Sequence, residues 1–237
     1  MCGRYTLSTN AQVLADLFRL EEALALPPRY NIAPTQDVAI VRSEAEGGGR
    51  RLSLAHWGLI PSWAKDRGLG ARMINARADT AAEKPAFRAA FKARRCLIPA
   101  DGFFEWKATG ERKQPHYIRL QDAGPFAFAG LWERWAPADG EPIESCTILT
   151  TEPNEVLRPI HDRMPVILPP EAWSLWLDPA VRERERLQPL LVPHPAAAMI
   201  AYPVGLGVNS ARRDDPSCIE PLAGVPKPPP PREPTLF

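Results

Sequence analysis

Proline is the residue that most restricts how this chain can fold. It occurs 28 times among 237 residues. Proline fixes φ and lacks the backbone donor that helix interiors and central strands need, so this frequency favours short strands joined by long ordered loops. The hydrophobic content of 45% is still enough to bury a substantial core. We therefore expect a sheet-based fold with few helices.

Strand patterns recur along the chain, and helical patterns are fewer. "DVAIVRS" and "LSLAHWGLI" predict a hairpin around the Gly-rich turn "EAEGGGRR". Further strands are predicted at "CLIPA", "GFFEWK", "PHYIRL", "FAFAGLW", "CTILTT" and "MPVIL", and a short one directly after Cys2. Helices are predicted at 8–20, with Ser8 or Thr9 as the N-cap, and at 80–93 and 170–178.

These patterns predict one α+β domain over residues 1–222. Its core would be a curved, mainly antiparallel and barrel-like β-sheet flanked by short helices. Residues 223–237 end in "GVPKPPPPREPTLF", which predicts a flexible, extended tail without a catalytic part. A PxxP ligand for another protein is the alternative interpretation of this tail.

Charge and cysteine content limit the classes of function. Lys and Arg number 29 against 28 Asp and Glu, so any affinity for nucleic acid must come from local clusters. The four cysteines lie far apart, which argues against a disulfide framework or a metal site, and no cofactor is expected. Without a signal-peptide pattern or a long apolar run, the sequence favours a cytoplasmic protein with no membrane span.

Cys2 follows the initiator methionine, and its small side chain would allow Met1 to be removed. The exposed residue would then carry a free amine beside its thiol, with reference pKa values of about 7.7–8.0 and 8.5. A useful share of each group would be nucleophilic near neutral pH. The alternative is an ordinary second residue with no special chemistry.

Three further segments combine side chains suited to chemistry on a phosphate-bearing substrate. "MINARADT" would place Asn75 and Arg77 on one face of an extended segment, where an amide and a guanidinium could bind a polar ligand. In "DGFFEWK", strand alternation surrounds Glu105 with aromatic bulk, which would raise its pKa. His161 in "RPIHDRMPVI" is the best neutral-pH acid or base. Structural roles for each are the alternatives.

Basic and aromatic side chains suggest where a strand of nucleic acid could lie. Trp63, in a predicted loop, could stack on a base, although a core anchor is the usual role of a single Trp. A basic run could face phosphates, although a solvated helix face is the commoner explanation for such a run. Its members are Lys84, Arg88, Lys92, Arg94 and Arg95.

Six ordered motifs together resemble one family. They are "MCGRY", "RYNIAPTQ", "WGLIPSWAKD", "INARADT", "DGFFEWK" and "IHDRMPVIL". Over Cys2 to about residue 220 the chain resembles the SRAP family, named for SOS-response-associated peptidases. The resemblance implies a DNA-associated protein that acts on single-stranded DNA containing abasic sites. We expect a monomer, since one small lesion needs one site.

The same resemblance implies a mechanism and a set of site residues. The Cys2 amine would condense with the abasic aldehyde and the thiol would close a thiazolidine ring, shielding the lesion. Release of the residue before Cys2 and some β-elimination would occur at the same site. Cys2, Asn75, Glu105 and His161 are the implied catalytic residues. The implied DNA-binding residues are Arg4, Asn31, Pro34, Trp63, Arg77 and Arg163, of which Asn31 and Pro34 shape the groove.

Two other classes of function remain open from the residues. An N-terminal-nucleophile hydrolase or peptidase would use Cys2 to attack an amide, with Glu105 or His161 as base. A non-covalent reader of single strands would use the Arg and Trp side chains and would not need Cys2.

Overall fold

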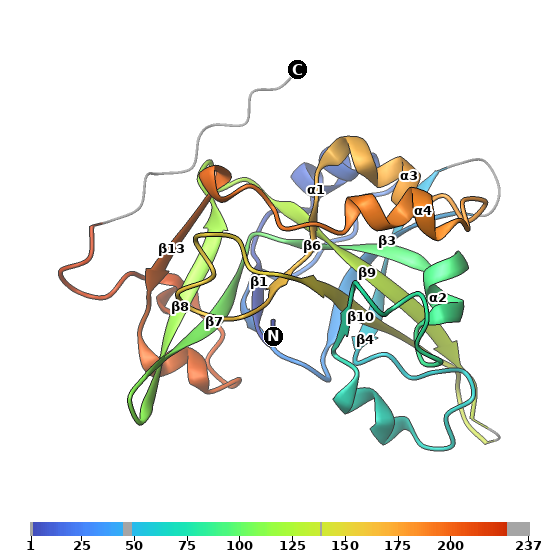
Figure 1. The fold of residues 1–237 in the computed structure, drawn as a ribbon, viewed down its shortest axis with the longest axis horizontal. Coiled ribbons are helices and arrows are strands. Elements are labelled where there is room, and N and C mark those ends of the chain that lie inside the picture. The colour runs from blue at the N-terminus through green and yellow to red at the C-terminus, as the bar shows by residue number, and fades with distance from the viewer. Residues whose placement is uncertain (1, 45–48, 138, 227–237) are drawn as a thin grey trace.

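Two β-sheets form the body of the molecule (Figure 1). The structure is a computed structural model that describes residues 2–44, 49–137 and 139–226. The smaller sheet has five antiparallel strands in the order β13-β8-β7-β1-β2. Their bounds are β1 (Tyr5–Leu7), β2 (Arg29–Ile32), β7 (Gly102–Thr109), β8 (Arg112–Leu120) and β13 (Met199–Pro203).

The larger sheet closes on itself. Its strands follow the order β10-β4-β3-β6-β9, and β9 pairs back onto β10. Only the β10–β4 pairing in this ring is parallel. The bounds are β3 (Asp37–Ser43), β4 (Arg50–Trp57), β6 (Arg95–Ala100), β9 (Phe126–Trp135) and β10 (Ile143–Thr151). This closed mixed barrel beside an antiparallel sheet confirms the predicted α+β, barrel-like fold.

Three short strands complete the larger sheet. β5 (Asn75–Arg77) runs parallel to β10, while β11 (Met164–Pro165) and β12 (Ile167–Leu168) pair with β10 and β9. The predicted hairpin is confirmed by the β3–β4 pairing, although the tip of its turn, residues 45–48, lies outside the described residues.

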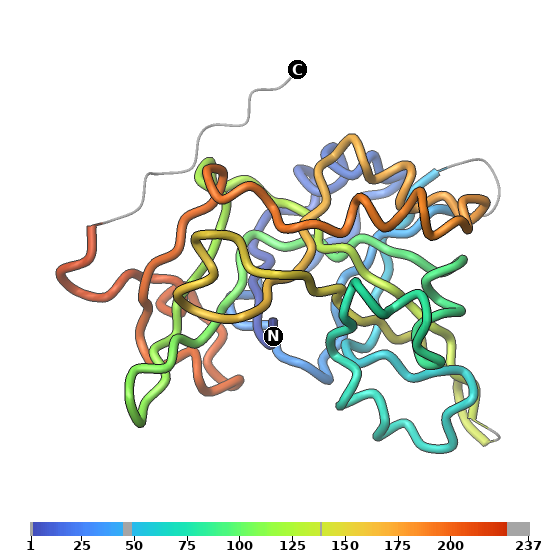
Figure 2. Tube along the Cα trace, in the orientation of Figure 1, coloured from blue at the N-terminus to red at the C-terminus, as the bar shows by residue number. Residues whose placement is uncertain are grey.

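The two sheets share one apolar core. The Tyr5 ring of β1 lies 5.3 Å from the Trp57 ring of β4 and 5.8 Å from the Phe128 ring of β9, and all three are buried in one cluster. Cys2 belongs to the same buried cluster. The N-terminal end of the chain therefore lies between the two sheets, as the trace in Figure 2 also shows.

The helices are short, in agreement with the frequency of proline. They are α1 (Ala11–Phe18), α2 (Arg88–Ala93), α3 (Trp173–Leu177) and α4 (Arg184–Leu187). Short 3-10 helices span Arg67–Arg72, Pro170–Ala172, Gln188–Leu190, Ala196–Ala198, Leu206–Asn209 and Pro216–Ile219. Within the described ranges, no helix is both long and apolar enough to span a bilayer.

Two of the helix predictions need correction. Asn10 is the N-cap of α1, and its side chain accepts from the Val13 amide at 2.9 Å. Ser8 and Thr9 instead donate their hydroxyls to Asp101 at 2.8 and 2.6 Å, which ties the chain before α1 to the turn before β7. The helix predicted at 80–93 is only α2, because the segment before it forms turns around Pro85.

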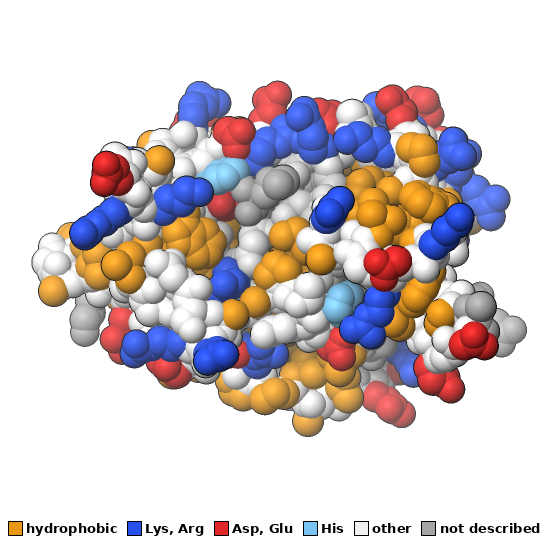
Figure 3. Space-filling view, turned by 90° about the horizontal axis from the view of Figure 1, so that it is seen from below, with side chains coloured by type: hydrophobic (Ala, Val, Ile, Leu, Met, Phe, Trp, Pro, Cys, Tyr) orange, Lys and Arg blue, Asp and Glu red, His pale blue; other side chains and the backbone are white. Residues whose placement is uncertain are grey.

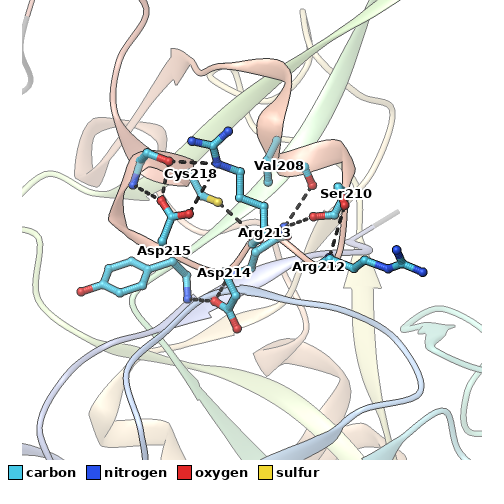
Figure 4. Close-up of polar contacts among 10 residues, drawn as sticks. Val208, Ser210, Arg212, Arg213, Asp214, Asp215 and Cys218 are labelled. Atoms are coloured by element: carbon cyan, nitrogen blue, oxygen red, sulfur yellow. Dashed lines mark hydrogen bonds and ion pairs between the residues drawn. The ribbon is translucent and has the colours of Figure 1, made fainter.

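The segment after β13 folds back onto β2 (Figure 4) and onto Arg4, the residue before β1. Asp214 accepts hydrogen bonds from the Tyr30 and Asn31 amides and pairs with Arg29. The Asn31 amide group is fully buried and donates to the carbonyls of Val208, Ser210 and Arg213 at 3.1, 3.0 and 2.7 Å. Val225 still packs against the body, whereas residues 227–237 of the predicted tail lie outside the described residues. The domain boundary at residue 222 stays a prediction.

Asn31→Ala should lower the free energy of unfolding by about 2–3 kcal/mol, because it leaves buried polar groups without partners. Urea denaturation measures this loss. The exposed N-cap change Asn10→Ala is the control and should cost about 1 kcal/mol. A loss for Asn31→Ala no larger than the control would show that the fold-back segment adds little stability.

Candidate active site

Strand pairing carries the N-terminal residues to the middle of the smaller sheet. β1 lies between β2 and β7, with Tyr5 opposite Phe103, and the Phe104 amide donates to the Arg4 carbonyl at 3.0 Å. Following the antiparallel register outward brings Glu105 beside the N-terminal end of β1. Cys2 lies there, fully buried, with its thiol 3.8 Å from the Arg4 carbonyl oxygen.

Asn75 reaches Cys2 from the larger sheet. β5 is aligned on β10, with Asn75 opposite Ile148, so that Ala76 packs into the core while the side chain of Asn75 points to the site. Its Nδ2 donates to the Cys2 carbonyl at 2.8 Å. Its Oδ1 is buried and accepts no hydrogen bond from any described residue. Asn75 therefore fixes the backbone of Cys2 and keeps an acceptor available.

Glu105 is a buried carboxyl at the same place. The alternation predicted for β7 is confirmed, since Phe103 packs into the main core and Phe104 into a second cluster on the opposite face. The Glu105 side chain is only 2% exposed, and this burial raises the pKa of its carboxyl to about 7. Such a group can accept or donate a proton near neutral pH.

His161 approaches Glu105 from the loop between β10 and β11. The Asn154 side chain accepts from the Val156 and Leu157 amides, and the Leu157 carbonyl accepts from the His161 amide at 2.8 Å. These bonds shape the turn that presents the ring. His161 Nε2 then lies 3.9 Å from Glu105 Oε2.

The other ring nitrogen of His161 has two neighbours. Nδ1 lies 3.1 Å from the Arg163 amide, which donates to it when it carries no proton. It also lies 2.9 Å from Asp162 Oδ1, to which it donates when protonated. Burial lowers the pKa of His161, which favours the neutral ring. Because Nδ1 has a hydrogen-bond partner in either protonation state, the His161 ring can gain or lose a proton while it keeps its position.

Burial also governs the nucleophile. It raises the pKa of the Cys2 thiol well above its usual range, and the nearby negative charge of Glu105 acts in the same direction. The neutral thiol is therefore the resting form, so a base must take its proton when it reacts. Glu105 is a suitable base, because its pKa of about 7 leaves a useful share of carboxylate at neutral pH.

The predicted DNA-binding residues occupy different positions in the molecule. Arg77 is 57% exposed and pairs with Asp79, and Trp63 is 59% exposed beside a shallow hollow lined also by Lys65 and Arg72. Arg163 is half-buried, and its Nη2 has no hydrogen-bond partner among the described residues. Pro34 is half-buried in the turn after β2.

Arg4 and Asn31 are joined to each other and to the fold-back segment. Arg4 Nη1 donates to Asn31 Oδ1 at 2.9 Å and to the Val208 carbonyl at 2.7 Å. Burial lowers the pKa of Arg4. The polar atoms of Asn31 bind protein groups, and its part in shaping a DNA groove stays a prediction.

Two members of the basic run bind protein groups. Arg94 pairs with Glu133 at 2.6 Å. Arg95 is buried, and its guanidinium donates to the carbonyls of Phe91, Lys92, Trp176, Asp178 and Val181. The interpretation of Arg95 as phosphate-facing is therefore wrong, because its charge serves to join α2 to α3.

The surface seen from below carries no single block of positive charge (Figure 3). Lys and Arg side chains are most frequent along the upper margin of this face, and others lie singly across its middle among hydrophobic and uncharged surface, with Asp and Glu interspersed. Among the residues that the structure describes, no cluster of His, Cys, Asp or Glu could hold a metal ion. The four cysteines are buried free thiols.

Three carboxylates make contacts that were not predicted from the sequence. Asp101 fixes the chain before α1, and Asp214 fixes β2 from a distance of more than 180 residues in sequence. No local signal could have revealed either contact. Asp79 stands two residues after Arg77 in "INARADT", so the short spacing could have suggested their pairing.

Comparison with known proteins decides the family. The model of the family described as "SOS response associated peptidase (SRAP)" matches residues 1–211. The chain belongs to the SRAP family. The resemblance of the six sequence motifs is thereby confirmed.

Similar proteins within and beyond bacteria carry related names. The chain is 45% identical over 224 residues to the abasic site processing protein YoqW of Bacillus subtilis (strain 168), covering 93% of this chain and 99% of that protein. It is 34% identical over 232 residues to the abasic site processing protein HMCES of Gallus gallus, covering 84% of this chain and 68% of that protein.

Solved structures share the fold. A crystal structure of a Bacteroides thetaiotaomicron protein matches with a TM-score of 0.83 at 29% identity, covering 93% of this chain and 99% of that one. A second, from Bordetella bronchiseptica, matches with a TM-score of 0.74 at 28% identity, covering 86% and 100%.

Proposed function

We propose that this SRAP protein processes abasic sites in single-stranded DNA by linking itself to them through Cys2. The observation that carries the proposal is the convergence of Cys2, Asn75, Glu105 and His161 from separate segments at one buried point. The names of YoqW and HMCES support abasic sites as the substrate.

The reaction uses both nucleophiles of one residue. With Met1 removed, the Cys2 amine attacks C1′ of the ring-opened sugar, and loss of one water gives an imine. The thiol sulfur then adds to the same carbon while its proton passes to the nitrogen, which closes a five-membered thiazolidine. The ring resists hydrolysis better than the imine, so the protein would stay on the lesion.

The proposed roles of the other residues come from the family resemblance, and their positions support them. The amide of Asn75 holds the Cys2 carbonyl and so aims its amine and thiol. Glu105 takes the thiol proton and returns it, since its pKa of about 7 suits both steps. His161, 3.9 Å from Glu105, would assist opening of the sugar ring and proton transfer to its oxygen.

The same groups could catalyse two side reactions. Where Met1 has not already been removed because the second side chain is small, Cys2 as nucleophile and Glu105 as base could also release it, in line with the peptidase in the family description. An imine at C1′ would also allow β-elimination. Arg77, Arg163 and Arg4 would contact phosphates, and Trp63 would stack on a base.

The test is the intact mass of the denatured protein after mixing with a single-stranded oligonucleotide carrying one abasic site. We expect an adduct of the protein without Met1 plus the oligonucleotide minus one water. The matched control replaces the abasic sugar with its tetrahydrofuran analogue, which has no aldehyde and should give no adduct. Equal adducts with both oligonucleotides, or none with either, would contradict the proposal.

A further inference from the structure

The end of β5 turns back on itself at the rim of the site. The Arg77 carbonyl accepts from the Thr80 and Ala81 amides at 3.2 and 2.8 Å. The Ala78 amide meanwhile stays bonded to the Thr150 carbonyl of β10 at 2.9 Å. This tight turn brings the Asp79 side chain against the Arg77 guanidinium.

The Asp79 carboxylate occupies one edge of the Arg77 guanidinium. Arg77 Nε donates to Asp79 Oδ1 at 3.2 Å, and Arg77 Nη2 donates to Asp79 Oδ2 at 2.6 Å. Such a bidentate contact is the strong form of a carboxylate–guanidinium pair. The hydrogen bond raises the pKa of Arg77 and lowers that of Asp79, and the charge of Arg163 also favours ionised Asp79.

The backbone around Asp79 is anchored from a different element. Arg184 of α4 donates from Nη2 to the Asp79 carbonyl at 3.2 Å, and Gln188 donates to the Ala78 carbonyl at 3.4 Å. The Asp79 carboxylate therefore stays near the end of β5, whether the Arg77 side chain binds Asp79 or a phosphate.

We propose that Asp79 is a specificity-determining residue that weakens the grip of Arg77 on undamaged single strands. This inference rests on the proposed function, in which Arg77 contacts a DNA phosphate. The Asp79 carboxylate neutralises the guanidinium and holds its Nε–Nη2 edge, so a phosphate must compete for it. Retention on DNA then depends on the Cys2 reaction and not on the backbone contacts alone.

The inference predicts how the salt dependence of DNA binding changes when the Asp79 charge is removed. When Arg77 neutralises a phosphate, a condensed counterion leaves the DNA, which contributes about 0.7 to the salt slope for a single strand. If Arg77 leaves Asp79 to do so, the carboxylate takes up a cation, and part of that release is cancelled. Removing the Asp79 charge should therefore steepen the salt dependence as well as tighten binding.

The experiment compares Asp79→Asn with Glu83→Gln. Asparagine keeps the size and one acceptor of Asp79, removes its charge and replaces the second acceptor with a donor. Glu83 is an exposed carboxylate nearby, and its partner is Arg184 instead of Arg77. Fluorescence anisotropy with an undamaged single-stranded oligonucleotide, titrated across salt concentrations, gives Kd and its slope.

We expect Asp79→Asn to lower Kd about two- to fivefold at low salt, as befits one exposed ion pair, and to steepen the slope. Glu83→Gln should change Kd less than about twofold. Weaker binding by Asp79→Asn would show that the carboxylate orients Arg77 for phosphate. An equal gain in both variants would show only an effect of net charge, and either result overturns the inference.

Measuring Asp79→Asn in a protein that also carries Arg77→Ala tests this inference separately from the proposed function. Arg77→Ala alone should weaken binding to undamaged and abasic strands alike, and no change would remove Arg77 from the phosphate contacts. If Arg77→Ala weakens binding, the gain from Asp79→Asn must disappear in the double variant. A gain that persists without Arg77 would overturn the part assigned to Asp79 while leaving the Cys2 reaction standing.

Discussion

Cys2→Ala should yield no stable adduct with an abasic oligonucleotide under conditions in which the wild type is converted completely. Alanine is small enough for Met1 to be removed, so the variant keeps a free amine but loses the thiol. The reaction would stop at the imine, which water reverses. Intact mass under denaturing conditions should therefore show free protein, and added cyanoborohydride should convert the imine into a trapped amine adduct.

Non-covalent affinity separates loss of chemistry from loss of structure. Phosphate contacts do not involve the thiol, so Cys2→Ala should bind an undamaged strand with a Kd within about twofold of the wild type and with the same salt slope. Because Cys2 is buried, the thermal unfolding of the Cys2→Ala variant should be measured together with its Kd. A folded Cys2→Ala protein that still forms an adduct without reductant would refute the thiazolidine mechanism.

The sheet-based fold and one part of the site were predictable because they rest on local patterns. Alternation in "GFFEWK" placed Glu105 on the face of Phe103, and the structure has Phe103 and Phe104 in two different clusters. The short distance from Cys2 to the first strand required it to lie at a strand end. Proline frequency limited helix length, and the longest described helix has 8 residues.

The rest depends on contacts between residues that are distant in sequence. Asn75 reaches Cys2 only because β5 lies in register with β10, and no pattern near either residue indicates that pairing. Asp214 fixes β2 through a segment that looked like loop. Arg95 looked like a surface cation because sequence cannot tell a charge that binds water from one that binds buried carbonyls. The assignment of roles at the site rested on family resemblance.

Glu105→Gln should slow adduct formation about 100-fold or more at pH 7.5, the usual range for losing a positioned acid-base group. Its pH profile should change as well. In the wild type, the rate should rise with pH in two steps, as the carboxyl ionises at about 7 and the amine loses its proton at a pKa of about 7.7–8.0. Glutamine removes the first step, so the midpoint of the profile should move upward. Single-turnover rates between pH 5.5 and about 9 measure it.

Stability supplies a second readout of the same buried carboxyl. Because the pKa of Glu105 rises from 4.5 to about 7 on folding, the wild type loses stability as pH rises through that interval. Glutamine does not ionise, so the stability of Glu105→Gln relative to the wild type should increase by about 2 kcal/mol from pH 5 to pH 8. Glu144→Gln, which breaks the ion pair with Arg42 on the barrel, is the matched control and should leave the rate profile unchanged. If Glu105→Gln shows the stability change but reacts at the wild-type rate, Glu105 is buried as described yet takes no part in proton transfer, and His161 becomes the base to test.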